Sequence, residues 1–122
     1  MEIDQITEKI IGCAYQVSNT LGSGFLEKVY ENALAIEIRK SGLRVEQQFP
    51  INVLYKNNIV GEYIADLYVE GTALVELKAI KSLEDIHMAQ CLNYLKATDK
   101  QICLLINFGK PRVQIKRIVN NL

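Results

Sequence analysis

Hydrophobic positions recur along the chain with two different spacings, which predict helices and strands in a definite order. Near the N-terminus they return every three or four residues, so residues 3 to about 20 should form an amphipathic helix. A second helix is expected from about 26 to 40, and Ser41-Gly42 should end it. Residues 45–55 then read as a strand, with Pro50 indicating an edge position or a bulge.

The second half of the chain is expected to complete a mixed sheet. A polar turn at residues 56–58 leads into a strand over 59–69, and a further strand follows over 73–79. A helix from about 83 to 97 has Ser82 as its predicted N-cap, and strands over 102–108 and 113–119 end the chain. The predicted order is α-α-β-β-β-α-β-β, in one domain spanning residues 1–122 without linkers or repeats.

Three charged residues stand within the otherwise strand-like run from 64 to 80. Residues two apart on a strand face the same side, so Glu76 and Lys78 should project together. If the Glu70-Gly71 step folds the two strands into a hairpin, Asp66 and Glu76 converge on a divalent cation with Lys78 beside it. The alternative is a same-face ion pair on a solvated sheet, which contributes little.

A stripe of polar side chains is expected on the third helix. His87, Gln90, Cys91 and Tyr94 follow helical spacing and share one face. This stripe could border a catalytic site, with His87 as an acid–base group or a phosphate contact. It could equally be a satisfied polar cluster in the core, where a buried amide such as that of Gln90 needs partners.

Composition is typical of a soluble globular protein, with 49% hydrophobic and 23% charged residues. No apolar run has the length of a membrane span, and the acidic N-terminus is unlike a signal peptide. Cys13, Cys91 and Cys103 stand far apart in apolar segments, without zinc-ligand spacing. We therefore expect reduced core thiols in a cytoplasmic protein.

Charge is balanced overall but not along the chain. The formal net charge is zero, yet residues 96–122 hold six basic side chains and one acidic side chain. A local basic edge could take phosphates, although a solvated surface strand explains it nearly as well. A coat of nucleic acid over the whole surface is excluded.

Three segments together resemble one family. Residues 24–30 read G-x-x-E-x-x-Y, the centre holds Asp66 with Glu76-x-Lys78, and residues 87–95 precede the run Leu-Leu-Ile-Asn-Phe-Gly at 104–109. In this order they resemble the GxxExxY proteins, a small-domain branch of the PD-(D/E)xK nuclease-like superfamily. The resemblance covers nearly the whole chain. It implies an α/β (α+β sandwich) fold, in which helices flank a mixed central sheet.

The resemblance also implies roles for individual residues. Asp66 and Glu76 resemble the metal ligands, and Glu27 the helical acidic residue that supports the metal. Lys78 resembles the residue that positions the attacking water or stabilises the charge of the transition state. Gln90 and Tyr94 resemble the auxiliary helix residues. The motif's proline is absent, since Ala65 precedes the aspartate. From helical spacing we expect Glu27 to reach inward while Tyr30 packs beside it in a structural role, burying its ring and orienting a carboxylate through its hydroxyl. Gly24 should be a turn residue with positive φ before the helix.

The function that these expectations favour is Mg²⁺- or Mn²⁺-dependent hydrolysis of phosphodiester bonds in DNA or RNA. Lys81, Lys110 and Arg112 are expected to contact the nucleic acid, no membrane is involved, and a homodimer would give so small a domain more surface. The alternative is a catalytically silent scaffold or protein-interaction module with this fold. A glycosidase is a weaker alternative, because Lys78 has no part in that chemistry.

Overall fold

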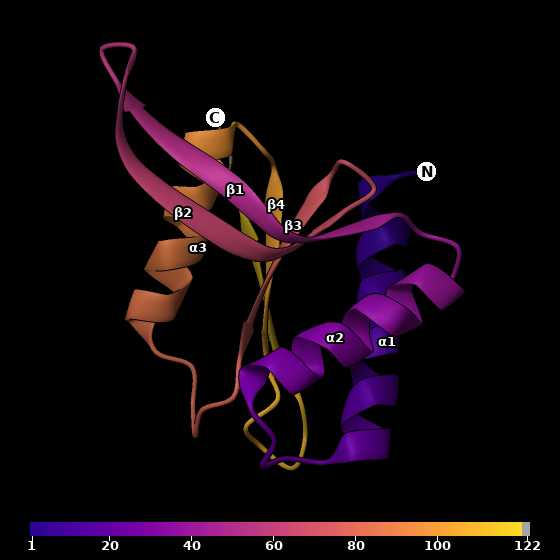
Figure 1. Ribbon diagram of the computed structural model, residues 1–122. Helices are drawn as coiled ribbons and strands as arrows, with labels where there is room; N and C mark the ends of the chain where they lie inside the picture. The colour runs from indigo at the N-terminus through magenta and orange to yellow at the C-terminus, as the bar shows by residue number, and fades with distance from the viewer. Residues whose placement is uncertain (121–122) are drawn as a thin grey trace.

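The computed structural model describes residues 1–120, and its elements follow the predicted order around a five-stranded mixed sheet (Figure 1). The strands lie in the order β1-β2-β3-β4-β5. All neighbours are antiparallel except β3 and β4, which are parallel and are connected through helix α3. This confirms the predicted fold class. The elements are α1 (Ile3–Leu21), α2 (Glu27–Lys40), β1 (Val45–Tyr55), β2 (Asn58–Val69), β3 (Ala73–Lys78), α3 (Asp85–Thr98), β4 (Ile102–Asn107) and β5 (Gln114–Val119).

Helices cover both faces of the sheet, as Figure 1 shows. Val75 and Leu77 of β3 pack into the core that α1 and α2 form on one face. Leu74 belongs to the smaller core beneath α3 on the other face, together with Cys91 and Cys103. All six residues of β4 are buried, as a strand covered on both faces requires. Among the described residues, no helix is long and apolar enough to cross a membrane.

The predicted cysteine burial is confirmed. Cys13, Cys91 and Cys103 are all buried free thiols. Cys13 lies in the core of α1 and α2, and the other two lie beneath α3. Their packing, rather than any covalent link, is what they contribute to the fold.

Strands β1 and β2 extend well beyond the rest of the sheet. β2 pairs with β3 only over residues 67–69, so the two strands continue as a two-stranded arm, residues 49–64 (Figure 1). Lys56 and Asn57 form its turn with φ of 50° and 66°, the left-handed conformation that a tight hairpin needs. β1 pairs with β2 alone, which confirms the edge position that Pro50 indicates.

Helix α3 begins two residues later than predicted, and Ser82 is not its cap. The N-cap is Glu84, and its backbone N–H donates to Nδ1 of His87 at 2.9 Å. His87 at the third helical position therefore satisfies a backbone donor at the helix start. Ser82 stands in the bend that precedes it.

The G-x-x-E-x-x-Y segment holds the turn between α1 and α2. The Tyr30 hydroxyl donates to the Gly22 carbonyl at 2.5 Å and accepts from the Phe25 N–H at 3.2 Å. Its ring stacks on Phe108 with 4.7 Å between centroids. Gly24 has φ of 114°, as predicted. The expectation that the Tyr30 hydroxyl orients a carboxylate is wrong, because both of its partners are backbone groups.

The Asn-Phe-Gly end of β4 fixes the loop that follows β3. The Asn107 side chain donates to the Ile80 carbonyl at 2.9 Å and accepts from the Ile80 N–H at 3.0 Å and the Gly109 N–H at 2.9 Å. A Cβ on Gly109 would lie 2.1 Å from the Ile80 oxygen, so only glycine allows this approach. The C-terminal end of β3, with Lys78, is thereby held in place.

Candidate metal centre at a split in the sheet

Asp66 and Glu76 meet where β2 and β3 part. Backbone pairing between these strands stops at Leu67 and Val75, and the same register would set Asp66 opposite Glu76. Beyond this point, hydrogen bonds between backbone N–H groups and carboxyl side chains connect the two strands. The Asp66 N–H donates to Oε1 of Glu76 at 3.3 Å, and the Leu77 N–H donates to Oδ2 of Asp66 at 2.7 Å. The structure thus brings the two carboxyl groups together inside the sheet.

Burial makes this carboxyl pair hold a proton at neutral pH. Glu76 is only 6% exposed, and burial together with the neighbouring Asp66 carboxylate raises the pKa of Glu76 to about 9. Burial also raises the pKa of Asp66. Two carboxylates this close cannot both be charged without a compensating cation. A divalent ion is the natural replacement for the proton, because carboxylate oxygens are its preferred ligands.

The buried acidic residue in the first two turns of α2 is Glu31, not Glu27. Glu27 is exposed at the first position of the helix, so the expectation that it reaches inward is wrong. The buried stripe of α2 runs through Tyr30, Glu31 and Leu34 and begins one turn after Glu27. Glu31 is 4% exposed, and its charge is among the factors that raise the pKa of Asp66. Within residues 1–120, no three His, Cys, Asp or Glu side chains converge as a metal-binding group.

A strained segment of β1 anchors Glu31. The Glu31 carboxylate accepts from Nε2 of Gln47 at 2.7 Å, from Nε2 of Gln48 at 2.8 Å and from Nζ of Lys28 at 3.1 Å. Consecutive residues of a strand normally face opposite sides. Gln48 has φ of 56° and is skipped in the pairing with β2, so both amides reach α2. No sequence motif marks either glutamine, although Pro50 does indicate an edge position or a bulge nearby.

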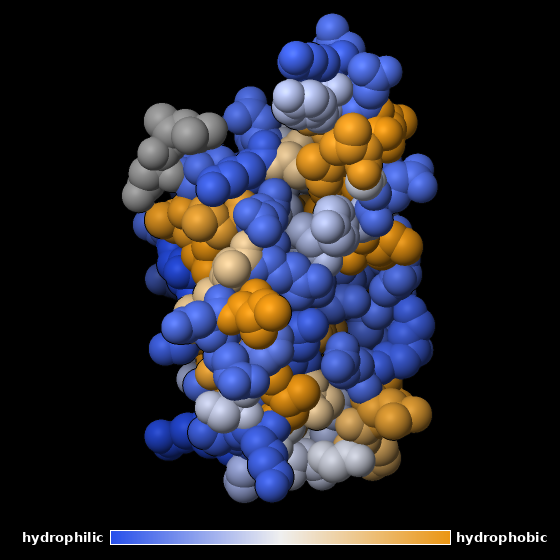
Figure 2. Space-filling view, turned by 90° about the vertical axis from the view of Figure 1, so that its left-hand side faces the viewer, coloured by the Kyte–Doolittle hydropathy of each residue, from blue (hydrophilic) through white to orange (hydrophobic). Residues whose placement is uncertain are grey.

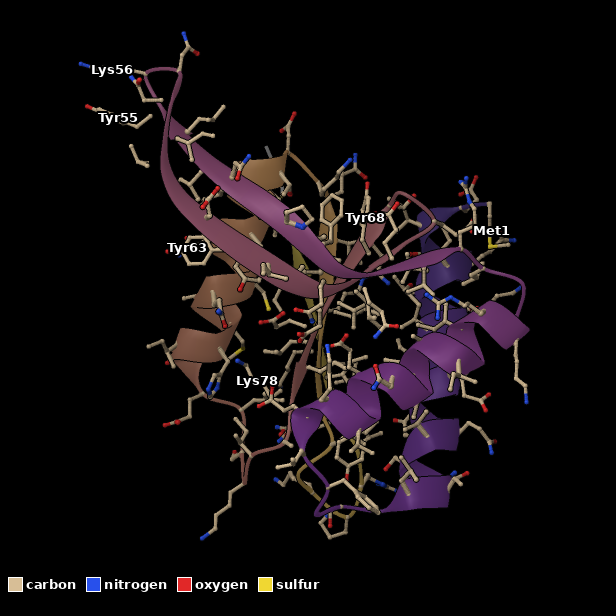
Figure 3. The ribbon with its side chains drawn as sticks, viewed as in Figure 1. Met1, Tyr55, Lys56, Tyr63, Tyr68 and Lys78 are labelled. Carbon is tan, nitrogen blue, oxygen red and sulfur yellow. The ribbon has the colours of Figure 1, made fainter. Side chains whose placement is uncertain are left out.

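Lys78 stands beside the carboxyl pair and has no ion-pair partner within residues 1–120. It is the half-buried last residue of β3 (Figure 3). Its charge lowers the pKa of both Asp66 and Glu76, against the larger effect of burial. No described carboxylate lies within 4.0 Å of its ammonium group. The alternative that Lys78 is only an ion-pair partner therefore has no support in this structure.

Tyr94 links helix α3 to strand β2 near the carboxyl pair. Its hydroxyl accepts from Nε2 of Gln90 at 3.0 Å and donates to the Ile64 carbonyl at 3.5 Å. Burial raises the pKa of Tyr94, and the charges of Glu76 and Asp66 raise it further. Gln90 therefore reaches the site through Tyr94. The Nδ1 atom of His87 accepts a hydrogen bond at the helix start, and a role for this residue in the chemistry of the site stays a prediction.

The basic residues expected to contact nucleic acid lie on two neighbouring loops. Lys81 follows β3, while Lys110 and Arg112 lie between β4 and β5. The hydrogen bonds of Asn107 to Ile80 bring these loops together. The three cations thus stand at the end of the sheet where Lys78 lies.

Comparison with known proteins agrees with this geometry. A family model described as the PD-(D/E)XK nuclease superfamily matches residues 4–118, so the chain belongs to this superfamily. The narrower likeness to the GxxExxY proteins stays a prediction.

Two solved structures share the fold. One is an alkaline exonuclease (LHK-Exo) from Laribacter hongkongensis, 14% identical with a TM-score of 0.52, over 94% of this chain and 82% of the exonuclease. The other is LHK-Exo in complex with dAMP, also 14% identical, with a TM-score of 0.54 over 94% and 83%. None of the curated proteins matches the chain.

Proposed function

We propose that this chain hydrolyses phosphodiester bonds in nucleic acid, using Mg²⁺ or Mn²⁺ held by Asp66 and Glu76. The observation that carries the proposal is the buried carboxyl pair at the split between β2 and β3, with the unpaired Lys78 beside it. Membership of the nuclease superfamily supports it. So does the shared fold with an exonuclease whose structure is known with a bound nucleotide, dAMP.

The donor set fits a hard divalent cation. Mg²⁺ usually takes one or two carboxylates from a protein and completes its shell with water and substrate phosphate oxygens. Asp66 and Glu76 supply those two carboxylates, and Glu76 would release its proton as the ion binds. When bound, the ion supplies Lewis-acid polarisation of a phosphate oxygen and lowers the pKa of a coordinated water.

The surrounding residues serve the same chemistry. Lys78 offers a free ammonium group to the negative charge that develops on the phosphate during hydrolysis. Glu31, held by Gln47 and Gln48, keeps a fixed negative charge on the side of α2. Lys81 and the basic loop at residues 110–112 would bind the flanking phosphates of DNA or RNA.

One observation favours the scaffold alternative. The Glu31 carboxylate already accepts hydrogen bonds from three side chains, and only two carboxyl groups meet at the split among the described residues. A protein that keeps this fold without catalysis would retain these contacts and bind no divalent ion. Cleavage and metal binding therefore separate the two functions.

The test is cleavage of single- and double-stranded DNA and RNA by wild type and Lys78→Ala, with Mg²⁺, with Mn²⁺ and with EDTA. Loss of one well-placed donor should lower the rate by roughly 10²- to 10³-fold. Lys56→Ala, at the tip of the arm, is the matched control and should cleave as wild type does (Figure 3). Wild-type rates from a normally folded Lys78→Ala protein would refute the catalytic role.

A further inference from the structure

A groove lies between the arm and helix α3. One end is near the carboxyl pair, and the groove extends from there toward the tip of the arm. It consists of two hollows of about 390 and 600 Å³ that share Tyr63 and Asn93 in their walls. The hollow nearer the site is also lined by Gln90 and Tyr94. The Tyr94 hydroxyl donates to the Ile64 carbonyl at 3.5 Å, two residues before Asp66 on β2, so this end of the groove lies next to the candidate metal centre. Each hollow has the size in which proteins hold a small organic group.

The lining of the groove combines aromatic, amide and apolar groups. Tyr63 is 50% exposed, and its ring centroid lies 5.7 Å from that of Tyr94. Asn93 and Gln90 add amide groups, and Lys96 adds a cation to the outer hollow. No Asp or Glu lines either hollow. The lining therefore holds one cation and no carboxylate to repel a ligand that carries negative charge.

Apolar surface on the arm extends the same face. Leu54 and Val60 line the outer hollow and are more than half exposed. Figure 2 looks onto the side of the arm and α3, and shows hydrophobic surface directly below the polar hairpin tip. Gly61, between Val60 and the ring of Tyr63, leaves room in this wall, because a Cβ there would contact that ring and Val53 at 3.7 Å.

We propose that this groove binds a single strand of nucleic acid, with a base stacked on Tyr63 and the backbone led toward Asp66 and Glu76. This rests on the proposed function and adds its substrate class. Aromatic platforms, amide groups that reach base edges and a few cations are how proteins hold single strands. A paired duplex would hide its bases from Tyr63 and from the amides of Asn93 and Gln90.

The test is fluorescence anisotropy with a labelled twelve-nucleotide oligo-dT in EDTA, which measures binding without cleavage. Tyr63→Ala should weaken binding roughly 5- to 150-fold, the range known for loss of one stacking partner. Tyr63→Phe should bind as wild type, and so should Tyr55→Ala, a control at the tip of the arm (Figure 3). Gly61→Val should weaken binding by filling the wall, and wild type should prefer the single strand to a blunt duplex.

Three results would refute this groove as a single-strand site. The first is equal affinity of Tyr63→Ala and wild type for oligo-dT, and the second is no binding of oligo-dT by wild type. The third is self-association of wild type that Tyr63→Ala abolishes while its binding of oligo-dT is unchanged. The proposed function is judged separately, by cleavage with Mn²⁺. If wild type cleaves duplex but does not bind oligo-dT, the proposed function is supported and the proposed groove is refuted. If wild type binds oligo-dT through Tyr63 but cleaves nothing, the groove is supported and the proposed function is refuted.

Discussion

Replacing Glu31 by alanine should destabilise the protein strongly, whereas the same change at Glu27 should not. Glu31→Ala removes the two charge-assisted hydrogen bonds that the buried Glu31 carboxylate accepts from the half-buried Gln47 and the exposed Gln48. At about 1.5 kcal/mol each, these bonds amount to roughly 3 kcal/mol. The exposed Lys28 adds little. Without these bonds nothing offsets the strained backbone of Gln48, so the bulge in β1 should relax as well.

Thermal and urea unfolding of both variants measure this difference. Glu31→Ala should unfold roughly 9–18 °C below wild type, since each kcal/mol lowers Tm by roughly 3–6 °C in a domain of this size. Glu27→Ala should stay within about 0.5 kcal/mol of wild type, as expected for an exposed residue. Equal unfolding curves for the two variants would refute the assignment of Glu31 as the buried acidic residue of α2.

Two further predictions concern the proton on Glu76 and the hydrogen bonds of Tyr30. Without metal, the free energy of unfolding should fall as pH rises from about 4.5 toward 9, because the unfolded chain releases the Glu76 proton near 4.5 while the folded protein keeps it to about 9. Glu76→Gln should flatten this profile in urea titrations at several pH values, and an unchanged profile would show that Glu76 is not the group that titrates. Tyr30→Phe should cost about 2 kcal/mol in urea unfolding, because two backbone groups lose their partner while the stack on Phe108 stays. The Tyr30→Phe variant should cleave as wild type does, and a large loss of activity would show that the Tyr30 hydroxyl has a role in the active site.

The order of the helices and strands could be predicted from the sequence, because it follows from the spacing of hydrophobic residues. The strand over 45–55 has the predicted bounds, and the helices and turns lie within a few residues of expectation. Asp66 and Glu76 could be brought together from sequence, since the Glu70-Gly71 turn sets their register. These features depend on local pattern and on one short hairpin.

The rest of the site depends on contacts between distant segments. Glu27 and Glu31 lie on the same helix one turn apart, and only packing against β1 decides which of them is buried. The left-handed backbone at Gln48 is compensated by Glu31, seventeen positions earlier, so local propensity does not indicate it. Sequence predicts Ser82 as the cap of α3 because serine is a common N-cap, but the N-cap is Glu84, whose backbone N–H donates to His87, and the helix starts two residues later.

Calorimetric titration of the metal-free protein with Mn²⁺ tests the central claim most directly. Asp66 and Glu76 together should bind the ion in wild type, with protons released from the carboxyl pair at neutral pH. Asp66→Ala should give no saturable heat, while its far-ultraviolet circular dichroism stays that of the folded protein. Wild type without saturable binding, or an Asp66→Ala variant that binds Mn²⁺ as wild type does, would contradict a metal centre at the split between β2 and β3.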